Sequence, residues 1–240
     1  MKVGIRFFSL LVLLLVFANY SFAATSPKVF IKHGNVYCLD GKKKIQLTHS
    51  GKDRAPVLSP DCKKLVFIRE TSKISYTSED SGVDHPSNAD QLWVVGVDGK
   101  NEKMLVENKR PNESKMNNEK DDNQITKELE KMIDEIDDNN IKFSPDGKKV
   151  YFISSAWVTS GALHVVNLDG SNEHFIASAN NLERVVTKGK YKGDLVISQH
   201  RYNDKGSYDW YYLFTPAGKE VKALGDDQKN AEQISQKIRE

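Results

Sequence analysis

The chain has 240 residues, of which 38 % are hydrophobic and 28 % charged, a balance typical of one or two globular domains rather than of a membrane bundle or a disordered chain. Its 35 basic and 33 acidic side chains leave a net charge of +2, which excludes the strongly basic composition expected of a nucleic-acid-binding protein.

The first 23 residues have the pattern of a secretory signal peptide. Lys2 and Arg6 precede an apolar run over 7–18, and Ser21 and Ala23 form a small-x-small cleavage site. The apolar run is shorter than the ~20 residues that a membrane-spanning helix needs. Cleavage would leave an exported chain without a stable membrane span, and because both charges of the signal segment are basic, that chain would be neutral. We therefore do not expect nucleic acid as a partner.

Four turns of one design recur along the chain. Each follows a strand-like apolar pair, ends in a glycine and precedes an aliphatic residue six positions after that glycine. The turns are Leu39-Asp40-Gly41, Val97-Asp98-Gly99, Leu168-Asp169-Gly170 and Pro216-Ala217-Gly218, and the aliphatic residues are Leu47, Leu105, Ile176 and Leu224. Asp-Gly between two β-rich runs predicts a hairpin, because glycine adopts positive φ without a steric cost.

A second turn, built on Ser-Pro-Asp, alternates with these hairpins. Its two clear copies are Ser59-Pro60-Asp61-Cys62 and Ser144-Pro145-Asp146-Gly147, and a strand-like run follows each of them. Proline fixes φ at the entry of the turn, and the aspartate side chain can bond its own backbone. A weaker third copy joins residues 185–187 to residues 195–197.

The two kinds of turn together predict a long antiparallel meander. One unit of three strands, at about 28–48, is followed by three units of four strands, at about 55–107, 140–178 and 182–225. Short strands in repeated four-stranded sheets are typical of propeller blades. We predict an all-β, propeller-like domain at 24–225 with about four four-stranded blades, the first incomplete. The alternative is a β-sandwich with accidental Asp-Gly turns.

The stretch Ser-Pro-Asp-Gly-Lys-Lys-Val-Tyr-Phe at 144–152 and the Asp-Gly hairpins resemble the WD40-like repeats of TolB-type β-propellers. Similar repeats build the propellers of prolyl-oligopeptidase-type peptidases. The resemblance covers most of 28–225 and departs from the pattern at Cys62, at Ala217 and in the third Ser-Pro-Asp copy. It implies an exported, non-enzymatic interaction scaffold in the cell envelope, periplasmic or secreted. The TolB-type propeller has six blades, so either a small closed ring or an open arc is compatible with the repeat.

Two insertions and a tail depart from the meander. Residues 71–88 are predicted to form a polar loop, and the insertion at 107–139 to contain a helix. Its apolar stripe, at helical spacing, consists of Ile125, Leu129, Met132, Ile133 and Ile136. The helix either packs on its own blades or meets a partner, and Leu129, Met132 and Ile133 are the candidate partner surface. The polar tail, 226–240, either covers an exposed edge or is disordered.

No motif of an enzyme is present in the sequence. A nucleophile elbow, a phosphate-binding glycine loop, His-Glu-x-x-His and paired Cys-x-x-Cys are all missing. We therefore predict no catalytic residue, no cofactor and no metal, with an envelope protein as partner and the oligomeric state open. The alternative is a propeller-type lyase or hydrolase-related enzyme that holds a metal with histidines from several blades. The histidines are His33, His49, His85, His164, His174 and His200.

The last hairpin contains a run of aromatic residues from Tyr208 to Phe214. Strand alternation places Trp210, Tyr212 and Phe214 on one face and Tyr211 and Leu213 on the other. Packing between blades needs large residues on both faces, so we expect these side chains in the core. Any member that is exposed would form a binding patch, because Tyr and Trp are enriched among the residues that anchor interfaces.

Cys38 and Cys62 are a candidate disulfide. Export to an oxidising compartment permits one, and a meander would place the turns that they flank at the same end of neighbouring blades. The alternative is two unrelated cysteines, one packed on a strand and one in place of a turn glycine.

Overall fold

The computed structural model describes residues 26–77, 84–110, 122–226 and 238, and at 72–77 and 84–88 it describes the backbone alone. Within these ranges the strands form four antiparallel sheets, each of strands consecutive in the chain. The first sheet contains β1 (Lys28–Lys32), β2 (Asn35–Asp40) and β3 (Lys43–Gln46). The second contains β4 (Asp53–Leu58), β5 (Lys64–Thr77), β6 (Asp84–Gly96) and β7 (Lys103–Val106). The third contains β8 (Ile136–Phe143), β9 (Lys149–Ser155), β10 (Gly161–Asn167) and β11 (His174–Ala179). The fourth contains β12 (Asn181–Val185), β13 (Leu195–Asn203), β14 (Gly206–Phe214) and β15 (Glu220–Gly225).

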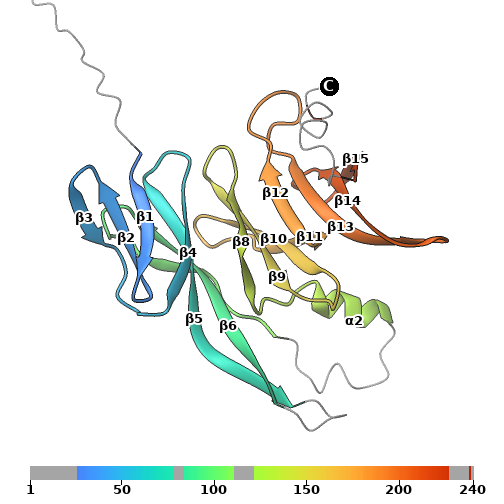
Figure 1. Ribbon diagram of the computed structural model, residues 1–240, viewed down its shortest axis with the longest axis horizontal. Coiled ribbons are helices and arrows are strands. Elements are labelled where there is room, and N and C mark those ends of the chain that lie inside the picture. Colours follow the sequence, from blue (N-terminus) through green and yellow to red (C-terminus); the bar gives the residue numbers. More distant parts are fainter. Residues whose placement is uncertain (1–25, 78–83, 111–121, 227–237, 239–240) are drawn as a thin grey trace, which may run out of the picture.

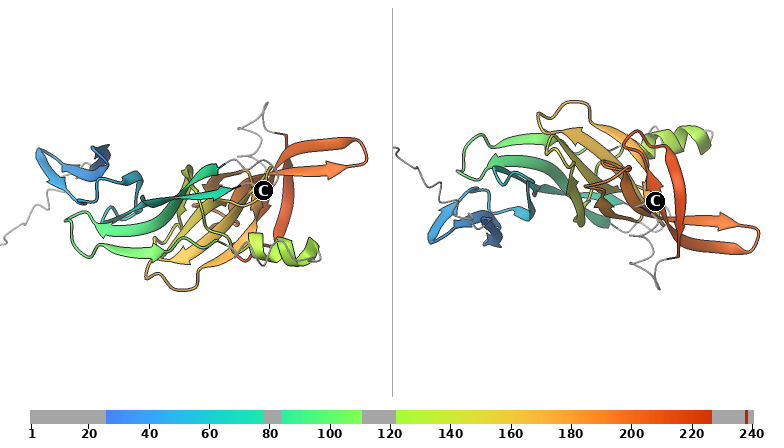
Figure 2. Two further views of the ribbon diagram at one scale, coloured as in Figure 1. Left: turned by 90° about the horizontal axis from the view of Figure 1, so that it is seen from below. Right: turned by 90° about the horizontal axis from the view of Figure 1, so that it is seen from above.

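These sheets confirm the predicted all-β, propeller-like arrangement with an incomplete first blade. The first strands of the full sheets, β4, β8 and β12, lie next to one another. The first sheet lacks such a strand, so β1 takes the position that β5, β9 and β13 have in the other sheets. The first and fourth sheets lie at opposite ends of the series (Figures 1 and 2), so the described part of the chain forms an open arc.

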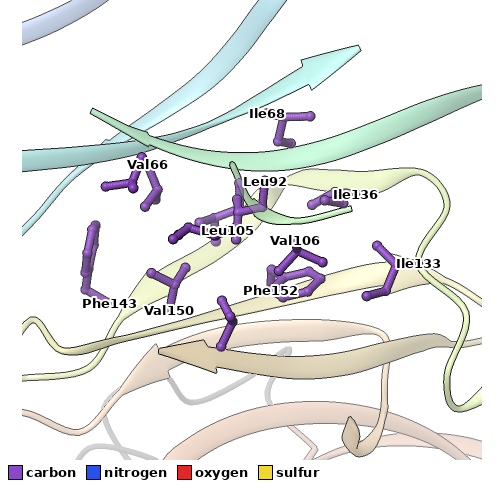
Figure 3. Close-up of a cluster of buried hydrophobic side chains, with 13 residues drawn as sticks. Val66, Ile68, Leu92, Leu105, Val106, Ile133, Ile136, Phe143, Val150 and Phe152 are labelled. Atoms are coloured by element: carbon purple, nitrogen blue, oxygen red, sulfur yellow. The ribbon is translucent and has the colours of Figure 1, made fainter. Parts of the chain in front are cut away.

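The core lies between the sheets, and strand alternation builds it. In β5, Leu65 and Phe67 pack toward the first sheet, whereas Val66 and Ile68 pack toward the third. Successive side chains of a strand point to opposite faces, so a sheet covered on both faces needs an unbroken apolar run. Figure 3 shows the cluster between the second and third sheets, where the side chains of both sheets interlock. Burying each such aliphatic side chain is worth ~1.5–3 kcal/mol.

The outer face of the fourth sheet is also covered. Val186, Val196, Leu213 and Leu224 form a separate apolar cluster there, and Ile238 packs against them. Of the predicted tail at 226–240, the structure describes Asp226 and Ile238. Ile238 therefore covers part of the end of the arc.

The turn glycines explain the spacing of the repeat. A Cβ on Gly99 would lie 3.7 Å from the carbonyl oxygen of Gln46, next to Leu47. A Cβ on Gly170 would lie 3.4 Å from the carbonyl oxygen of Leu105, and a Cβ on Gly218 would lie 2.5 Å from the carbonyl oxygen of Ile176. Each hairpin turn thus packs against the last strand of the preceding sheet, or directly after it, beside the aliphatic residue of the repeat. Among the described residues no sheet precedes that of Gly41, and a Cβ there would meet nothing within 4 Å.

Two sequence predictions about the insertions were wrong. The predicted polar loop at 71–88 is mostly strand, because the pairing of β5 with β6 continues outward to Thr77 and Asp84. The predicted apolar helix is also shorter than its stripe: α2 (Asp122–Leu129) ends before Met132, and Ile136 begins β8. Among the described residues, no helix is long and apolar enough to cross a membrane, and the predicted signal peptide lies outside them.

Candidate interaction surface

Hydrogen bonds within the Ser-Pro-Asp turns fix the connections between neighbouring strands. The Ser59 hydroxyl donates to Asp61 Oδ1 at 2.7 Å and accepts from the Lys64 backbone N–H at 3.0 Å. Ser144 makes the same two contacts, with Asp146 at 2.6 Å and Lys149 at 2.9 Å. These hydroxyl bonds, with a backbone N–H of the turn, lower the pKa of Asp61 and of Asp146. Both predicted turn motifs therefore stabilise strand connections.

The aspartates of the hairpin turns also accept hydrogen bonds from within their own turns. Asp169 Oδ1 accepts from the Ser171 hydroxyl and backbone N–H at 2.6 and 2.9 Å, and Asp98 Oδ1 accepts from the Lys100 N–H at 3.0 Å. The hydroxyl bond contributes most to the lowered pKa of Asp169. These two turns also line a cleft of about 580 Å³ between the second and third sheets. Lys103 crosses it and donates to the Asp169 carbonyl at 2.6 Å.

The candidate disulfide is not formed, and Cys38 and Cys62 are free thiols. Cys38 is buried in β2 within the apolar cluster between the first two sheets, where burial raises its pKa. Cys62 stands at φ 57° in the turn position where the other Ser-Pro-Asp turn has Gly147. The structure thus matches the alternative of one cysteine packed on a strand and one replacing a turn glycine.

The candidate partner surface on the insertion needs correction, because Ile133 is fully buried. It belongs to the cluster between the second and third sheets (Figure 3), and its backbone pairs with Lys109 through two N–H···O bonds of 2.8 Å. Beside it, Arg110 forms a bidentate ion pair with Asp134. Leu129 and Met132 remain half-buried. The base of the insertion therefore packs on its own blades.

A buried ion pair within the second sheet is bonded to the third sheet through Asp90. Arg54 donates through Nη1 and Nη2 to the two carboxylate oxygens of Asp90, at 2.8 and 2.6 Å, and Asp90 also accepts the Ile136 N–H at 2.8 Å. The Asp90 side chain is fully buried, and its hydrogen bond raises the pKa of Arg54. Removing one partner of such a pair would leave a buried charge uncompensated, so this network fixes the contact between the sheets.

His164 is another buried ionisable group. Its ring stacks on Phe152 at 5.3 Å and meets Phe175 edge-on at 6.0 Å. Nδ1 lies 2.8 Å from Glu173 Oε1, and Glu173 also pairs with Lys109. Burial raises the pKa of Glu173, but its bonds to His164 and Lys109 outweigh burial and leave this pKa below 4.5. The cluster joins the third sheet to the start of the insertion.

The histidines are distributed along the arc. Of those with described side chains, His33 lies in the β1–β2 turn of the first sheet, His49 between the first and second sheets, His164 and His174 in the third sheet and His200 in the fourth. His85 falls outside the described side chains. Among the side chains that the structure describes, no three His, Cys, Asp or Glu residues come together as metal ligands.

The aromatic run of the fourth sheet divides between core and surface. Tyr212 and Phe214 are buried between the third and fourth sheets, as the alternation predicts. Trp210 is 39 % exposed and Tyr202, which the sequence argument did not single out, is 69 % exposed. Both lie in the outer half of the β13–β14 hairpin, which projects beyond the rest of the sheet (Figures 1 and 2). We call the projecting end of this hairpin, with Tyr202 on one face and Tyr208 and Trp210 on the other, the hairpin patch.

Polar contacts position the aromatic rings of this hairpin. On one face Tyr208 meets Trp210 edge-on at 5.6 Å, and the Arg201 guanidinium lies 3.7 Å from the ring centroid of Tyr212. Arg201 also pairs with Glu220 at 2.7 Å. Burial, and then a hydrogen bond with Tyr208, raise the pKa of Tyr212 to about 12.

On the other face of the hairpin, the Tyr202 ring packs edge-on against His200 at 5.0 Å. His200 is held in turn by Asp209, at 2.9 Å. Rings fixed in this way lose little side-chain freedom when a partner covers them, which favours binding.

No protein-family model matches this chain, and no curated protein matches it. Solved structures do. The tricorn protease is 10 % identical with a TM-score of 0.53, over 85 % of this chain and 16 % of its own. Dipeptidyl peptidase 4 of Porphyromonas gingivalis is 12 % identical with a TM-score of 0.49, over 84 % of this chain and 31 % of its own. TolB of Acinetobacter baumannii is 9 % identical with a TM-score of 0.35, over 80 % of this chain and 48 % of its own. The chain thus spans less than half of each of these proteins, and its similarity to tricorn supports a propeller-type fold.

Proposed function

We propose that this protein is an exported, non-enzymatic scaffold that binds another protein of the cell envelope through the hairpin patch. The observation that carries the proposal is the exposure of Tyr202 and Trp210 on a projecting hairpin whose inner half is anchored in the core. Tyr, Trp and Arg are the residue types that dominate binding energy in protein interfaces. The resemblance of the repeats to TolB-type propellers fits the same role, and the signal-peptide pattern of residues 1–23 supports export.

A capture experiment with envelope extract tests the proposal. The doubly substituted Tyr202→Ser/Trp210→Ser protein should lose capture by about thirtyfold, which corresponds to ~2 kcal/mol for truncated anchor residues. Its melting temperature should stay close to that of the wild type, because both side chains are exposed. Met104→Ser/Val158→Ser removes two exposed apolar side chains elsewhere and should leave capture unchanged. Equal capture by all three proteins would refute the hairpin patch as the binding surface.

The alternative function, a lyase or hydrolase-related enzyme with a metal held by blade histidines, is tested separately. Metal analysis of the purified protein distinguishes the two proposals. One tightly bound metal ion per chain, lost on changing His164 or His200 to Ala, would favour the enzyme. Protein that captures its partner after exhaustive chelation would favour the scaffold.

A further inference from the structure

The first sheet has a strand edge with which no described strand pairs, and β4 of the second sheet lies beside β1. In the other three sheets the strand equivalent to β1 pairs on both sides, with β4, β8 or β12 on its inner side. β1 pairs with β2 alone, and no strand among the described residues pairs with its other edge. Unpaired N–H and C=O groups along such an edge are a template for one more strand. An extended peptide can satisfy them by β-augmentation.

One face of this sheet combines aromatic rings with lysines. Pairing of Phe30 with Tyr37 and of Leu39 with Lys44 places these side chains on a common face, and alternation adds Lys28 and Lys32. The rings of Phe30 and Tyr37 stack at 5.5 Å, and the Lys44 ammonium lies 4.7 Å from the Tyr37 centroid. We call these residues the basic face. It points away from the cluster of Val36 and Cys38 that packs on the second sheet.

The basic face also marks where the arc ends. The hairpin turns of the second, third and fourth sheets pack against the sheet before them, whereas a Cβ on Gly41 would meet nothing within 4 Å. Between residues 28 and 46 the sequence has five lysines and one acidic residue, Asp40. This end of the molecule therefore carries a net charge of +4, whereas the full chain carries +2.

The positive charge of the basic face indicates which kind of strand could pair with β1. A second copy of the chain would bring the same lysines together, and like charges facing each other oppose such pairing. A strand with acidic side chains would instead be attracted to Lys28, Lys32 and Lys44. Its alternate apolar side chains would lie on the opposite face of the sheet, next to Val29 and Ile31.

We propose that β1 and the basic face form a second binding site, which takes an extended acidic segment of a partner protein as the missing fourth strand of the first sheet. Backbone hydrogen bonds along β1 supply affinity, the lysines of the basic face select acidic residues, and Val29 and Ile31 on the opposite face select the apolar residues that alternate with them. The site lies at the opposite end of the arc from the hairpin patch (Figure 1), so the two can be tested independently.

Peptide binding followed by fluorescence anisotropy tests this site on the mature protein. The probe is a labelled peptide of about eight residues in which Asp or Glu alternates with Val and Phe. Lys28→Glu/Lys32→Glu should weaken binding by about tenfold or more, because two attractive contacts become repulsive. Lys188→Glu/Lys192→Glu makes the same charge change on exposed residues of the fourth sheet and should bind as the wild type does. Tyr202→Ser/Trp210→Ser should also bind normally.

Two further probes separate strand pairing from simple attraction between charges. The same peptide methylated on successive backbone nitrogens keeps its charge but has no edge left that can pair as a strand, so it should not bind. Heparin, a polyanion without a peptide backbone, should compete only weakly. The proposal is overturned if the acidic peptide does not bind the wild type, if both lysine variants bind it equally, or if the methylated peptide or heparin binds as well as the acidic peptide.

Discussion

Cys62 stands in a backbone conformation that suits glycine. Its φ of 57° matches the 68° of Gly147 in the equivalent turn, and an L-residue pays ~1–2 kcal/mol there. We expect Cys62→Gly to raise the free energy of unfolding by about 1 kcal/mol in urea denaturation. Gly147→Ala should lower it by about as much, because the new Cβ would make only an ordinary contact of 3.5 Å with Pro60. A loss of stability in Cys62→Gly would show that the thiol contributes more than the strain costs.

Glu173 couples stability to pH. Its pKa in the folded protein lies below the ordinary 4.5, so the folded state favours the ionised carboxylate. The stability that this provides is fully present above pH 4.5 and is lost as pH falls through the lowered folded-state pKa. Glu173→Gln should cost about 1–2 kcal/mol at neutral pH, because the bonds to His164 and Lys109 lose their charge.

The test of this coupling is urea unfolding between neutral and acidic pH. The Glu173→Gln protein should lose less stability than the wild type on acidification below pH 4.5. Asp61, Asp146 and Asp169 also have lowered pKa values and contribute the same acid dependence to both proteins. If the free energy of unfolding fell equally with pH in the two proteins, the proposed strength of the Glu173 bonds would be contradicted.

At the scale of elements, the turn glycines determine how closely successive sheets approach. Gly218→Ala should cost about 3 kcal/mol, because the new Cβ would lie 2.5 Å from the Ile176 carbonyl and φ is also positive. Gly41→Ala makes the same change at a positive φ in open space and should cost about 1 kcal/mol. Thermal unfolding of the two variants is the comparison. Equal losses would mean that the contact between sheets is unimportant at Gly218.

The sequence predicted those elements whose signal is local. The phase of the Asp-Gly turns, the Ser-Pro-Asp turns and the apolar runs gave the four sheets within a few residues, because turn chemistry and alternation act between near neighbours. The spacing of Ile133 and Ile136 fits a helix face, but both side chains are buried in the core between the second and third sheets, outside any helix. Short apolar runs leave helix and strand undistinguished.

Long-range contacts of the candidate sites gave no sequence signal. Arg54 and Asp90 are 36 positions apart, and nothing in the sequence indicates that β4 and β6 bring the two side chains together. Trp210 was predicted in the core, because alternation does not tell where a hairpin leaves its sheet. The basic face also depends on the absence of an inner strand, which turns Lys28 and Phe30 into the edge of the arc. Only the run Lys42-Lys43-Lys44 hints at it in the sequence.

At the scale of the whole molecule, the arc has two different ends. Ile238 covers part of the outer face of the fourth sheet, and the β13–β14 hairpin of this sheet carries the hairpin patch. The first sheet has an edge with which no described strand pairs, next to the basic face. A rigid stack of sheets holds these surfaces apart, which suits a scaffold that contacts partners at separate places. The central claim is that the hairpin patch contacts another protein.

Site-specific photo-crosslinking in intact cells tests that claim most directly. A photoreactive phenylalanine analogue is placed at Tyr202 and, as a control, at the exposed Lys188 on the β12–β13 connection of the same sheet. The account predicts a discrete protein adduct from position 202 and none from position 188. No adduct at position 202, or the same adducts from both positions, would contradict it.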